Sequence, residues 1–136
     1  MASPSFQFPV RVFYEDTDAG GIVYYANYLK FFERARTEWL RALGISQSSF
    51  LEHSLGFVVR RVEMDNIAPA RLDDLITVHT EIKQLKKASV MFSQTITHSN
   101  GTVLCRMEVN VACVDFTKNK PCPIPAFILG ALQSVS

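Results

Sequence analysis

The sequence predicts an α+β fold, in which a five-stranded antiparallel sheet packs against one long helix. Three patterns support this prediction. Apolar residues alternate with a period of two in several segments, they recur at three- and four-residue steps in one segment, and an Asn-Gly pair separates the last two alternating segments. The chain has 136 residues, of which 48% are hydrophobic. This length suits a single domain over residues 1–136 with a core of its own.

The first strand is predicted over residues 6–14, where the even positions are all apolar or aromatic. The long helix follows over residues 27–43, because its apolar side chains recur at helical spacing while charged side chains take the other side. Asn27 is suited to cap the start of this helix, and Gly44 is suited to close its end in a left-handed conformation. Residues 45–56 should form a loop or a short helical turn.

Four more strands are predicted, over residues 57–67, 75–85, 89–98 and 103–113. Because Asn100-Gly101 is a strong hairpin signal, the last three strands should form an antiparallel meander. The proline-rich tail should end in a short helix. One helix cannot cover both faces of such a sheet, and a strand at its edge leaves backbone groups unpaired. We therefore expect a homodimer or a homotetramer.

The charge and hydropathy of the chain argue against several classes of partner. The 14 basic and 13 acidic side chains give a net charge of +1, so no overall charge favours a nucleic acid or an anionic membrane. No run approaches the roughly 18 apolar residues of a membrane span, and the N-terminus lacks the features of a secretory signal. We expect a cytoplasmic protein without a membrane-inserted segment.

Cysteine and histidine spacings indicate neither a disulfide framework nor a metal site. Cys105 and Cys113 fall on one predicted strand, about 27 Å apart at about 3.4 Å per residue, which is too far for a disulfide. Buried thiols in a reducing compartment are the expectation. The three histidines, at positions 53, 79 and 98, show no metal-ligand spacing.

The segment YEDTDAGGIVYYANY, residues 14–28, is the candidate functional site. It places two acids, Asp16 and Asp18, beside a glycine pair and just before the helix. The first N–H groups of a helix lack intrahelical partners and can bind an oxyanion. Asp18 could therefore attack a carbonyl, or activate water, while a backbone N–H near Tyr25 polarises that carbonyl. A purely structural turn is the alternative, because aspartate and glycine are common in turns.

This segment and its continuation into LKFFERARTEWL resemble the signature of the hydroxybenzoyl-CoA thioesterase family of hot dog folds. Within that family they resemble the acyl-CoA thioesterases associated with Tol-Pal operons, the YbgC group. The resemblance rests on D-x-D-x-x-G-x-V, on the following Asn-Tyr and Glu-Arg-Ala-Arg, and on the order of elements through the final KPCPIP. It implies a hot dog fold, in which the five-stranded sheet wraps around the central helix.

The resemblance also implies the activity and the site. The chain would hydrolyse an acyl-CoA or aroyl-CoA to the free acid and CoA, with Asp18 as nucleophile or general base. The backbone N–H of Tyr25 would bind the thioester carbonyl, and Tyr14 would line the site. Tol-Pal members usually carry histidine where this chain has Tyr25, whereas the hydroxybenzoyl-CoA enzymes carry tyrosine. Aliphatic and aromatic substrates both stay open. Asp16 is expected to order the turn through a side-chain hydrogen bond.

Coenzyme A would be bound as part of the substrate, so the resemblance implies no separate cofactor and no metal. Lys86, Lys87 and Ser89 match the hairpin that holds the nucleotide phosphates in the family, and Lys120 or Lys118 could join them. The charges of the Glu-Arg-Ala-Arg stretch, at Glu33, Arg34 and Arg36, are interpreted as solvated or as facing an interface.

Two other classes of function are weighed against the enzyme. A non-catalytic module could bind acyl-CoA or an acyl carrier protein with the same fold, but binding alone does not require the Asp-x-Asp-x-x-Gly pattern. A hot dog dehydratase would need a catalytic histidine ahead of the central helix, and the sequence has none there.

Overall fold

The computed structural model describes residues 4–136. Its elements in chain order are β1 (Phe6–Arg11), a 3₁₀ turn (Tyr14–Asp16), α1 (Asn27–Ala42), α2 (Gln47–Glu52), β2 (Leu55–Asn66), β3 (Leu75–Leu85), β4 (Ser89–His98), β5 (Val103–Asp115), β6 (Lys120–Pro121) and α3 (Ala126–Gln133). The main strands pair in the order β1-β3-β4-β5-β2, and β6 pairs with β5. Every pairing is antiparallel, so the expected α+β class is confirmed.

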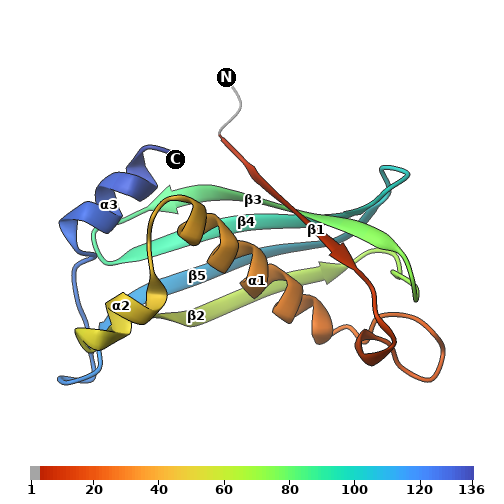
Figure 1. Cartoon of the computed structure of the whole chain (residues 1–136), viewed down its shortest axis with the longest axis horizontal. Helices are drawn as coiled ribbons and strands as arrows, with labels where there is room; N and C mark the ends of the chain where they lie inside the picture. Colours follow the sequence, from red (N-terminus) through yellow and green to blue (C-terminus); the bar gives the residue numbers. More distant parts are fainter. Residues whose placement is uncertain (1–3) are drawn as a thin grey trace.

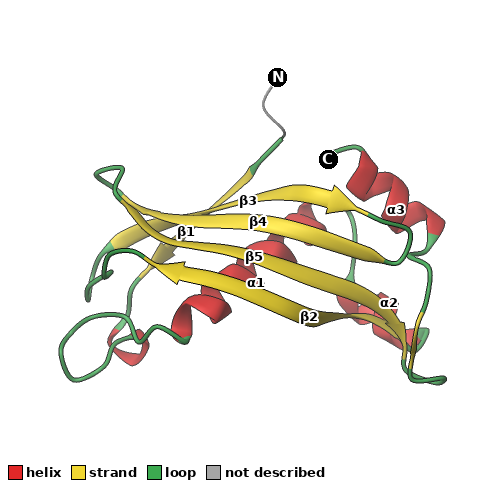
Figure 2. Cartoon of the chain, turned by 180° about the vertical axis from the view of Figure 1, so that it is seen from behind, coloured by secondary structure: helices red, strands yellow, loops and turns green. Residues whose placement is uncertain are grey.

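The long helix α1 crosses one face of the curved sheet (Figure 1). Seen from behind, the other face of the sheet carries no helix within the described residues (Figure 2). This is the hot dog arrangement that the resemblance implies. The meander β3-β4-β5 is also present as predicted, with a tight turn at Asn100-Gly101 in which Gly101 has a φ of 91°.

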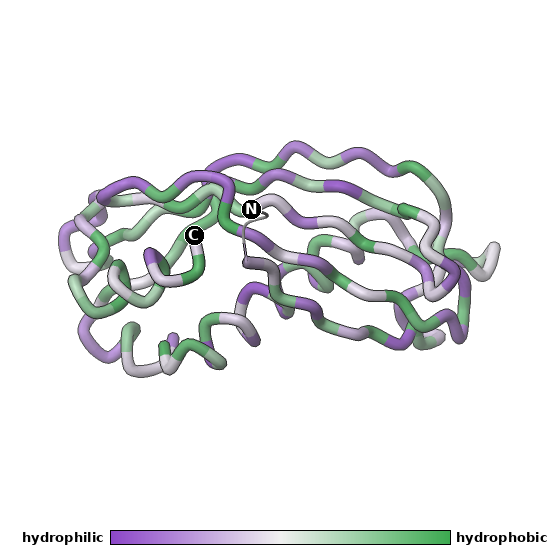
Figure 3. Tube along the Cα trace, turned by 90° about the horizontal axis from the view of Figure 1, so that it is seen from above, coloured by the Kyte–Doolittle hydropathy of each residue, from purple (hydrophilic) through white to green (hydrophobic). Residues whose placement is uncertain are grey.

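The core lies between α1 and the concave face of the sheet. Hydrophobic and hydrophilic residues alternate along the strands (Figure 3), as a half-buried sheet requires. Trp39 of α1 stacks on Phe6 at 6.1 Å between ring centroids and meets Phe92 edge-on at 6.4 Å. The other aromatic side chains that α1 buries are Tyr28, Phe31 and Phe32, and Leu40 is buried as well. Burying each apolar side chain of this size contributes about 1.5–3 kcal/mol.

One polar side chain, Gln94, occupies an inward position of β4 and is only 1% exposed. Its amide nitrogen donates to the carbonyl oxygen of Phe32 (3.0 Å) and to the hydroxyl of Thr80 (2.8 Å). Its amide oxygen accepts from Nη1 of Arg36 at 2.9 Å. Because every polar atom of this amide has a partner, burial costs little, and the network ties the middle of α1 to the sheet.

Several boundaries differ from the sequence prediction. The strand β1 ends at Arg11, and the 3₁₀ turn Tyr14–Asp16 occupies the end of the predicted strand. Asn27 does not cap α1, since Ala26 holds that position and the side chain of Asn27 bonds to Asp16 instead. The role of Gly44 is confirmed by its φ of 82°. The two-residue strand β6 is too short to show any periodicity.

The strand β2 forms an open edge of the sheet. It pairs with β5 on one side, and within residues 4–136 no strand pairs with its other side. Three valines on this strand, Val58, Val59 and Val62, are exposed. Unpaired, partly apolar strand edges of this kind are suited to pair with a second chain.

Across residues 4–136, no helix combines the length and the apolar character that a membrane crossing would need.

Candidate active site

The loop between β1 and α1 is a narrow hairpin that carries the two acids. The N–H of Asp18 donates to the carbonyl of Ile22 at 2.9 Å, and Thr17 forms a bridge with Val23. At the tip, Gly21 has a φ of 76°, a conformation that glycine adopts without strain. The N–H of Gly21 closes the turn by donating to the carbonyl of Asp18 at 3.0 Å. The glycine pair therefore forms the turn that presents Asp18.

Asp16 has the structural role that was expected for it. Its side chain is buried, with an exposed fraction of 8%. One carboxylate oxygen accepts from the N–H of Phe13 and the other accepts from the side-chain amide of Asn27, each at 2.8 Å. The backbone carbonyl of Asp16 also accepts from the N–H of Tyr24 at 3.1 Å. Asp16 thus links the end of β1, the return arm of the hairpin and the start of α1.

Asp18 lies in a different environment from Asp16. Its side chain is exposed in the single chain. Oδ1 accepts from the N–H of Gly20 at 2.9 Å, and Oδ2 has no hydrogen-bond partner among residues 4–136. One carboxylate oxygen is therefore oriented by the turn while the other is available for chemistry.

The start of α1 supplies hydrogen-bond donors next to this hairpin. The N–H groups of Tyr25 and Ala26 have no acceptor within the described part of the chain, whereas the N–H of Asn27 already donates to the carbonyl of Tyr24 at 2.7 Å. Free N–H groups at a helix N-terminus, together with the positive end of the helix dipole, favour an oxyanion. Within the described residues, the backbone N–H of Tyr25 that was expected to bind the thioester carbonyl thus has no acceptor in the protein.

A shallow cavity of about 250 Å³ opens beside the helix start. Tyr25 and Tyr28 line it together with Ile22, Val23, Asn66, Ile67, Ala68 and Pro69. The hydroxyl of Tyr28 accepts from the N–H of Ala70 at 3.1 Å, and burial raises the pKa of Tyr28. The wall of this cavity is therefore apolar and aromatic, with a neutral phenol at its base.

The four tyrosines of the segment do not share one role. Tyr28 belongs to the core, with an exposed fraction of 3%, whereas Tyr14 is 82% exposed and lies outside the lining of the cavity. The rings of Tyr24 and Tyr25 contact each other at 5.1 Å between centroids. Only part of the aromatic cluster forms a pocket wall in the single chain.

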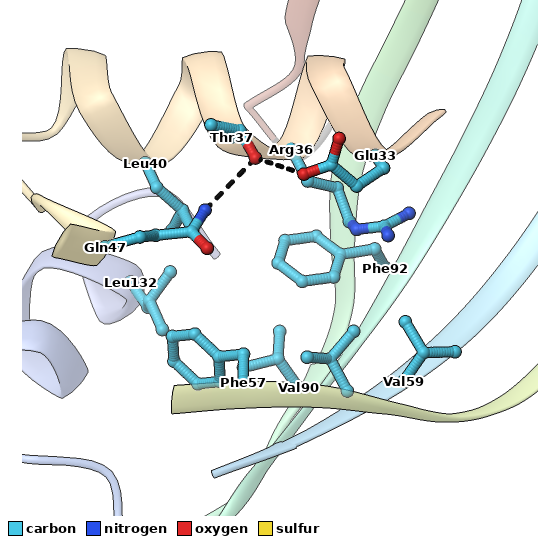
Figure 4. A pocket seen from close by; sticks show the side chains of 11 residues that line it. Glu33, Arg36, Thr37, Leu40, Gln47, Phe57, Val59, Val90, Phe92 and Leu132 are labelled. Atoms are coloured by element: carbon cyan, nitrogen blue, oxygen red, sulfur yellow. Dashed lines mark hydrogen bonds between the residues drawn. The ribbon is translucent and has the colours of Figure 1, made fainter. Parts of the chain in front are cut away.

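A second cavity, of about 100 Å³, lies between the middle of α1 and the strands β2, β4 and β5 (Figure 4). Its apolar wall includes Phe57, Val59, Val90 and Phe92. At its rim the hydroxyl of Thr37 donates to Glu33 at 2.8 Å and accepts from the amide of Gln47 at 3.1 Å. Sequence periodicity did not indicate this cavity, because it arises between elements that are distant in the chain.

Arg36 at this second cavity is not a fully solvated charge, which was one of the two alternatives expected for it; the other, a charge that faces an interface, stays a prediction. Its side chain is half-buried, bonds to Gln94, and has no ion-pair partner within residues 4–136. Burial lowers the pKa of Arg36, and the nearby charge of Glu33 acts in the opposite direction. The neighbouring residue Arg34 is exposed, as expected.

The lysines expected to bind phosphate gather at the other end of the sheet. Lys86, Lys87 and Ser89 surround the β3–β4 turn, and the carbonyl of Lys87 accepts from the N–H of Ile124 at 2.8 Å. Lys120 lies on β6, which pairs with the last residues of β5. The structure thus brings these residues to one end of the molecule.

That end is distant from the hairpin that carries Asp18. The strand β3 starts beside Arg11, near the hairpin, and ends just before Lys86 (Figure 1). Its ten residue steps of about 3.3 Å separate the two ends by about 33 Å. One chain alone therefore does not bring the lysines to Asp18.

No group of three or more His, Cys, Asp or Glu side chains among residues 4–136 is arranged to hold a metal ion. His79 is instead within hydrogen-bond distance of the Thr97 hydroxyl at 3.0 Å, and His98 lies 3.4 Å from a carboxylate oxygen of Asp74.

Comparison with known proteins identifies the family of the chain. Residues 12–132 match the Thioesterase-like superfamily. The acyl-CoA thioesterase YbgC of Haemophilus influenzae is 48% identical over 134 residues, which cover 98% of each chain. A 1,4-dihydroxy-2-naphthoyl-CoA thioesterase from Synechocystis has the same fold, with a TM-score of 0.90 at 22% identity over 96% of this chain and 97% of that one. A gentisyl-coenzyme A thioesterase gives a TM-score of 0.84 at 28% identity over 93% of this chain and 98% of that one.

The different roles of Asp16 and Asp18 can be tested by measuring the stability of variants at each position. Asp16→Ala should lower the free energy of unfolding by about 1.5–3 kcal/mol, because it removes hydrogen bonds to a buried carboxylate. Asp18→Ala should change it by no more than about 0.5 kcal/mol, since its side chain is exposed. Urea unfolding of both variants measures the difference. Equal losses would contradict the separate roles.

Proposed function

The chain belongs to the thioesterase-like superfamily and is an acyl-CoA thioesterase, and from this premise we propose that Asp18 and the start of α1 together hydrolyse the thioester. The observation that carries the proposal is the junction between the hairpin and α1. There a carboxylate with one unbonded oxygen and the unpaired N–H of Tyr25 belong to the same short segment. Attack on a carbonyl requires both groups, one as the nucleophile or base and the other as the donor to the carbonyl oxygen.

In the proposed reaction the thioester carbonyl oxygen accepts a hydrogen bond from the N–H of Tyr25. The bond polarises the carbonyl and stabilises the negative charge that develops on its oxygen. On the nucleophilic route, Oδ2 of Asp18 attacks the carbonyl carbon, the C–S bond breaks, and water then hydrolyses the acyl-aspartyl anhydride. On the general-base route, Asp18 takes a proton from the water that attacks. Either route consumes one water and yields a free acid and the thiol of CoA.

The exposure of Asp18 in one chain suggests that a second copy completes the site. Hydrogen bonds to a developing charge are strongest where water is excluded. We propose a homodimer in which the open edges of two β2 strands pair antiparallel about a two-fold axis. The exposed valines Val58, Val59 and Val62 favour such pairing. A homotetramer made of two such dimers would keep the same arrangement.

This dimer would also resolve the separation between Asp18 and the lysines. In each chain the start of β2 lies at the lysine end of the sheet, and the end of β2 lies at the hairpin end. Antiparallel pairing of the two β2 strands reverses one sheet relative to the other. The lysines of one subunit would then lie beside Asp18 of its partner, where Lys86, Lys87, Ser89 and Lys120 would bind the nucleotide phosphates of CoA.

The cavity beside the helix start supports an acyl or aroyl substrate. Its aromatic and aliphatic wall, which includes Tyr25, Tyr28 and Ile67, suits either an alkyl chain or an aryl ring. The backbone donor at Tyr25 does not depend on the side chain there. An acyl carrier protein, which presents a thioester at the end of a phosphorylated arm, would be a further substrate of the same chemistry. Access to CoA thioesters fits a cytoplasmic location.

The alternative is a module that binds acyl-CoA or an acyl carrier protein without cleaving it. Such a module would not need a carboxylate with a free oxygen at the helix start. Incubation with acyl-CoA separates the two functions, because the binding module retains the intact thioester and the enzyme releases a thiol.

Asp18→Asn tests the proposed role directly. The asparagine keeps the size of the side chain and an oxygen for the N–H of Gly20, but it cannot act as a base or a nucleophile. We expect kcat/KM for acyl-CoA hydrolysis to fall by at least about 100-fold, the order of loss seen when one oxyanion donor is removed. A thiol-release assay measures this.

The matched control is Glu15→Gln, which neutralises an exposed acid on the same loop. It should leave the rate within about two-fold, as is typical of exposed side chains without a specific contact. Full activity of Asp18→Asn would reject the role of Asp18, whereas binding without thiol release in the wild type would favour the non-catalytic module.

Mixed dimers test the supply of lysines by the partner. Lys86→Ala/Lys87→Ala should raise KM by about 10- to 100-fold in total, because both lysines are exposed and their bonds to phosphate are worth less than the about 1.5–3 kcal/mol of a buried charge-assisted hydrogen bond. Dimers that combine this variant with Asp18→Asn would pair an intact Asp18 with intact lysines at one of their two sites. Thiol release at low substrate concentration should therefore recover in the mixture.

The control for this experiment is each variant assayed alone at the same total concentration, after the same exchange of subunits. Recovery toward about a quarter of the wild-type rate is the expected result, because random exchange of equal amounts makes about half of the dimers mixed and each mixed dimer has one intact site of two. A mixture whose rate equals only the mean of the two separate variants would place the lysines and Asp18 on the same chain, or exclude the lysines from the site.

A further inference from the structure

A pair of thiols, Cys113 and Cys122, meets where β6 folds back on β5. Their sulfur atoms lie 3.3 Å apart, and the N–H of Cys122 donates to the carbonyl of Cys113 at 2.9 Å. The next pair along the ladder, Val114 and Pro121, is in register. Distance along one strand separates Cys113 from Cys105, whereas the turn before β6 brings Cys122 directly opposite Cys113.

The two thiols differ in their surroundings. Cys113 is fully buried, and burial together with the neighbouring Cys122 raises its pKa to about 12. Its sulfur also lies 3.8 Å from the carbonyl oxygen of Pro123. Cys122 is partly exposed at the end of a strand of only two residues. A reagent from solvent therefore reaches Cys122 first, and Cys113 is in contact behind it.

We propose that Cys113 and Cys122 form a thiol–disulfide exchange site that reacts with low-molecular-weight disulfides. In the first step the thiolate of Cys122 attacks one sulfur of the disulfide, whose S–S bond breaks and releases one thiol. In the second step Cys113 loses its proton as it attacks the sulfur of Cys122, and the second thiol leaves. The external disulfide gains two electrons as two thiols, and the protein gains one Cys113–Cys122 bond.

The geometry favours the second step. The sulfur atoms are already in contact and need to approach only from 3.3 Å to the bond length of about 2.05 Å. The strand β6 lies on the sheet periphery and has two residues, so it can move without disturbing the core pairs of β5. Contact between the thiols also makes the attack intramolecular, which compensates for the high pKa of Cys113.

The third thiol, Cys105, provides an internal control. It is fully buried, burial raises its pKa to about 12, and its nearest polar partner is the amide oxygen of Asn66 at 3.9 Å. It contacts neither of the other thiols within the described residues. Cys105 should therefore stay reduced under conditions that oxidise the pair.

The bond would fasten the end of the molecule that carries Lys118 and Lys120. These lysines lie in and after the turn between Cys113 and Cys122, and Ile124, two residues further on, bonds to the carbonyl of Lys87. Neither thiol belongs to the hairpin or to the start of α1. The inference therefore stands or fails independently of the role proposed for Asp18.

The experiment treats the reduced full-length protein with glutathione disulfide under native conditions, followed by acid quenching, alkylation after denaturation, and intact-mass and peptide analysis. Wild type and Cys105→Ser should both lose two hydrogens, with a cross-link between the peptides of Cys113 and Cys122. Cys113→Ser should retain one glutathione on Cys122, because the resolving thiol is absent. Cys122→Ser should stay reduced over the same time.

Three results would overturn the proposal. They are a wild type that keeps three alkylatable thiols, a wild type that accumulates the glutathione adduct without a cross-link, and a Cys122→Ser variant that reacts as fast as the wild type. Circular dichroism of each variant establishes that it is folded. The wild-type result decides the proposal even if one variant fails to fold.

Discussion

The hydrogen bonds of the buried Asp16 carboxylate are the interaction on which the site depends. They join the end of β1 to the first residue of α1, through Phe13 and Asn27. With those two points fixed, the short hairpin between them holds Asp18 at its tip and Tyr25 at the helix start. The two acids of the Asp-x-Asp pattern therefore have different roles. The first acid shapes the loop from inside the fold, and the second meets the solvent with one oxygen unbonded.

The length of the sheet is the second constraint. The two ends of β3, a strand of 11 residues, lie about 33 Å apart at about 3.3 Å per residue. Carboxylate and lysines stand at opposite ends of that strand, while β2 presents an open edge along the whole distance. In the proposed homodimer, a two-fold axis at this edge would bring the lysines of one subunit to Asp18 of the other.

Most of the secondary structure was predictable because the amphipathic periods of α1 and the strands are strong. The predictions for residues 75–85 and 89–98 match β3 and β4 in both bounds. The features that were wrongly predicted, such as the cap at Asn27, or not predicted at all, such as the burial of Gln94, depend on contacts between distant segments. Asn27 has the residue type of a helix cap, yet its amide is drawn to Asp16, and Gln94 fits an inward position only because Arg36, Phe32 and Thr80 supply its partners.

The candidate site, like the fold, was predictable only in part. The pairing of Asp18 with a helix start follows from local order in the sequence, with its catalytic role taken from the family resemblance. Local patterns could not indicate which tyrosines line a cavity, since Tyr25 and Tyr28 line it while Tyr14 faces solvent. Local patterns also could not predict the contact between Cys122 and Cys113. The strand β6 is too short to show a periodic pattern of apolar residues, and it is positioned by its pairing with β5.

The most direct measurement of the central claim is a crystal structure with a ketone analogue of acyl-CoA, in which a methylene group replaces the thioester sulfur. We expect the ketone oxygen to lie about 2.7–3.1 Å from the backbone nitrogen of Tyr25. The carboxylate of Asp18 should face the ketone carbon directly or through one water. A ketone bound elsewhere, with the N–H of Tyr25 still solvated and Asp18 turned away from it, would rule out the proposed roles of both groups.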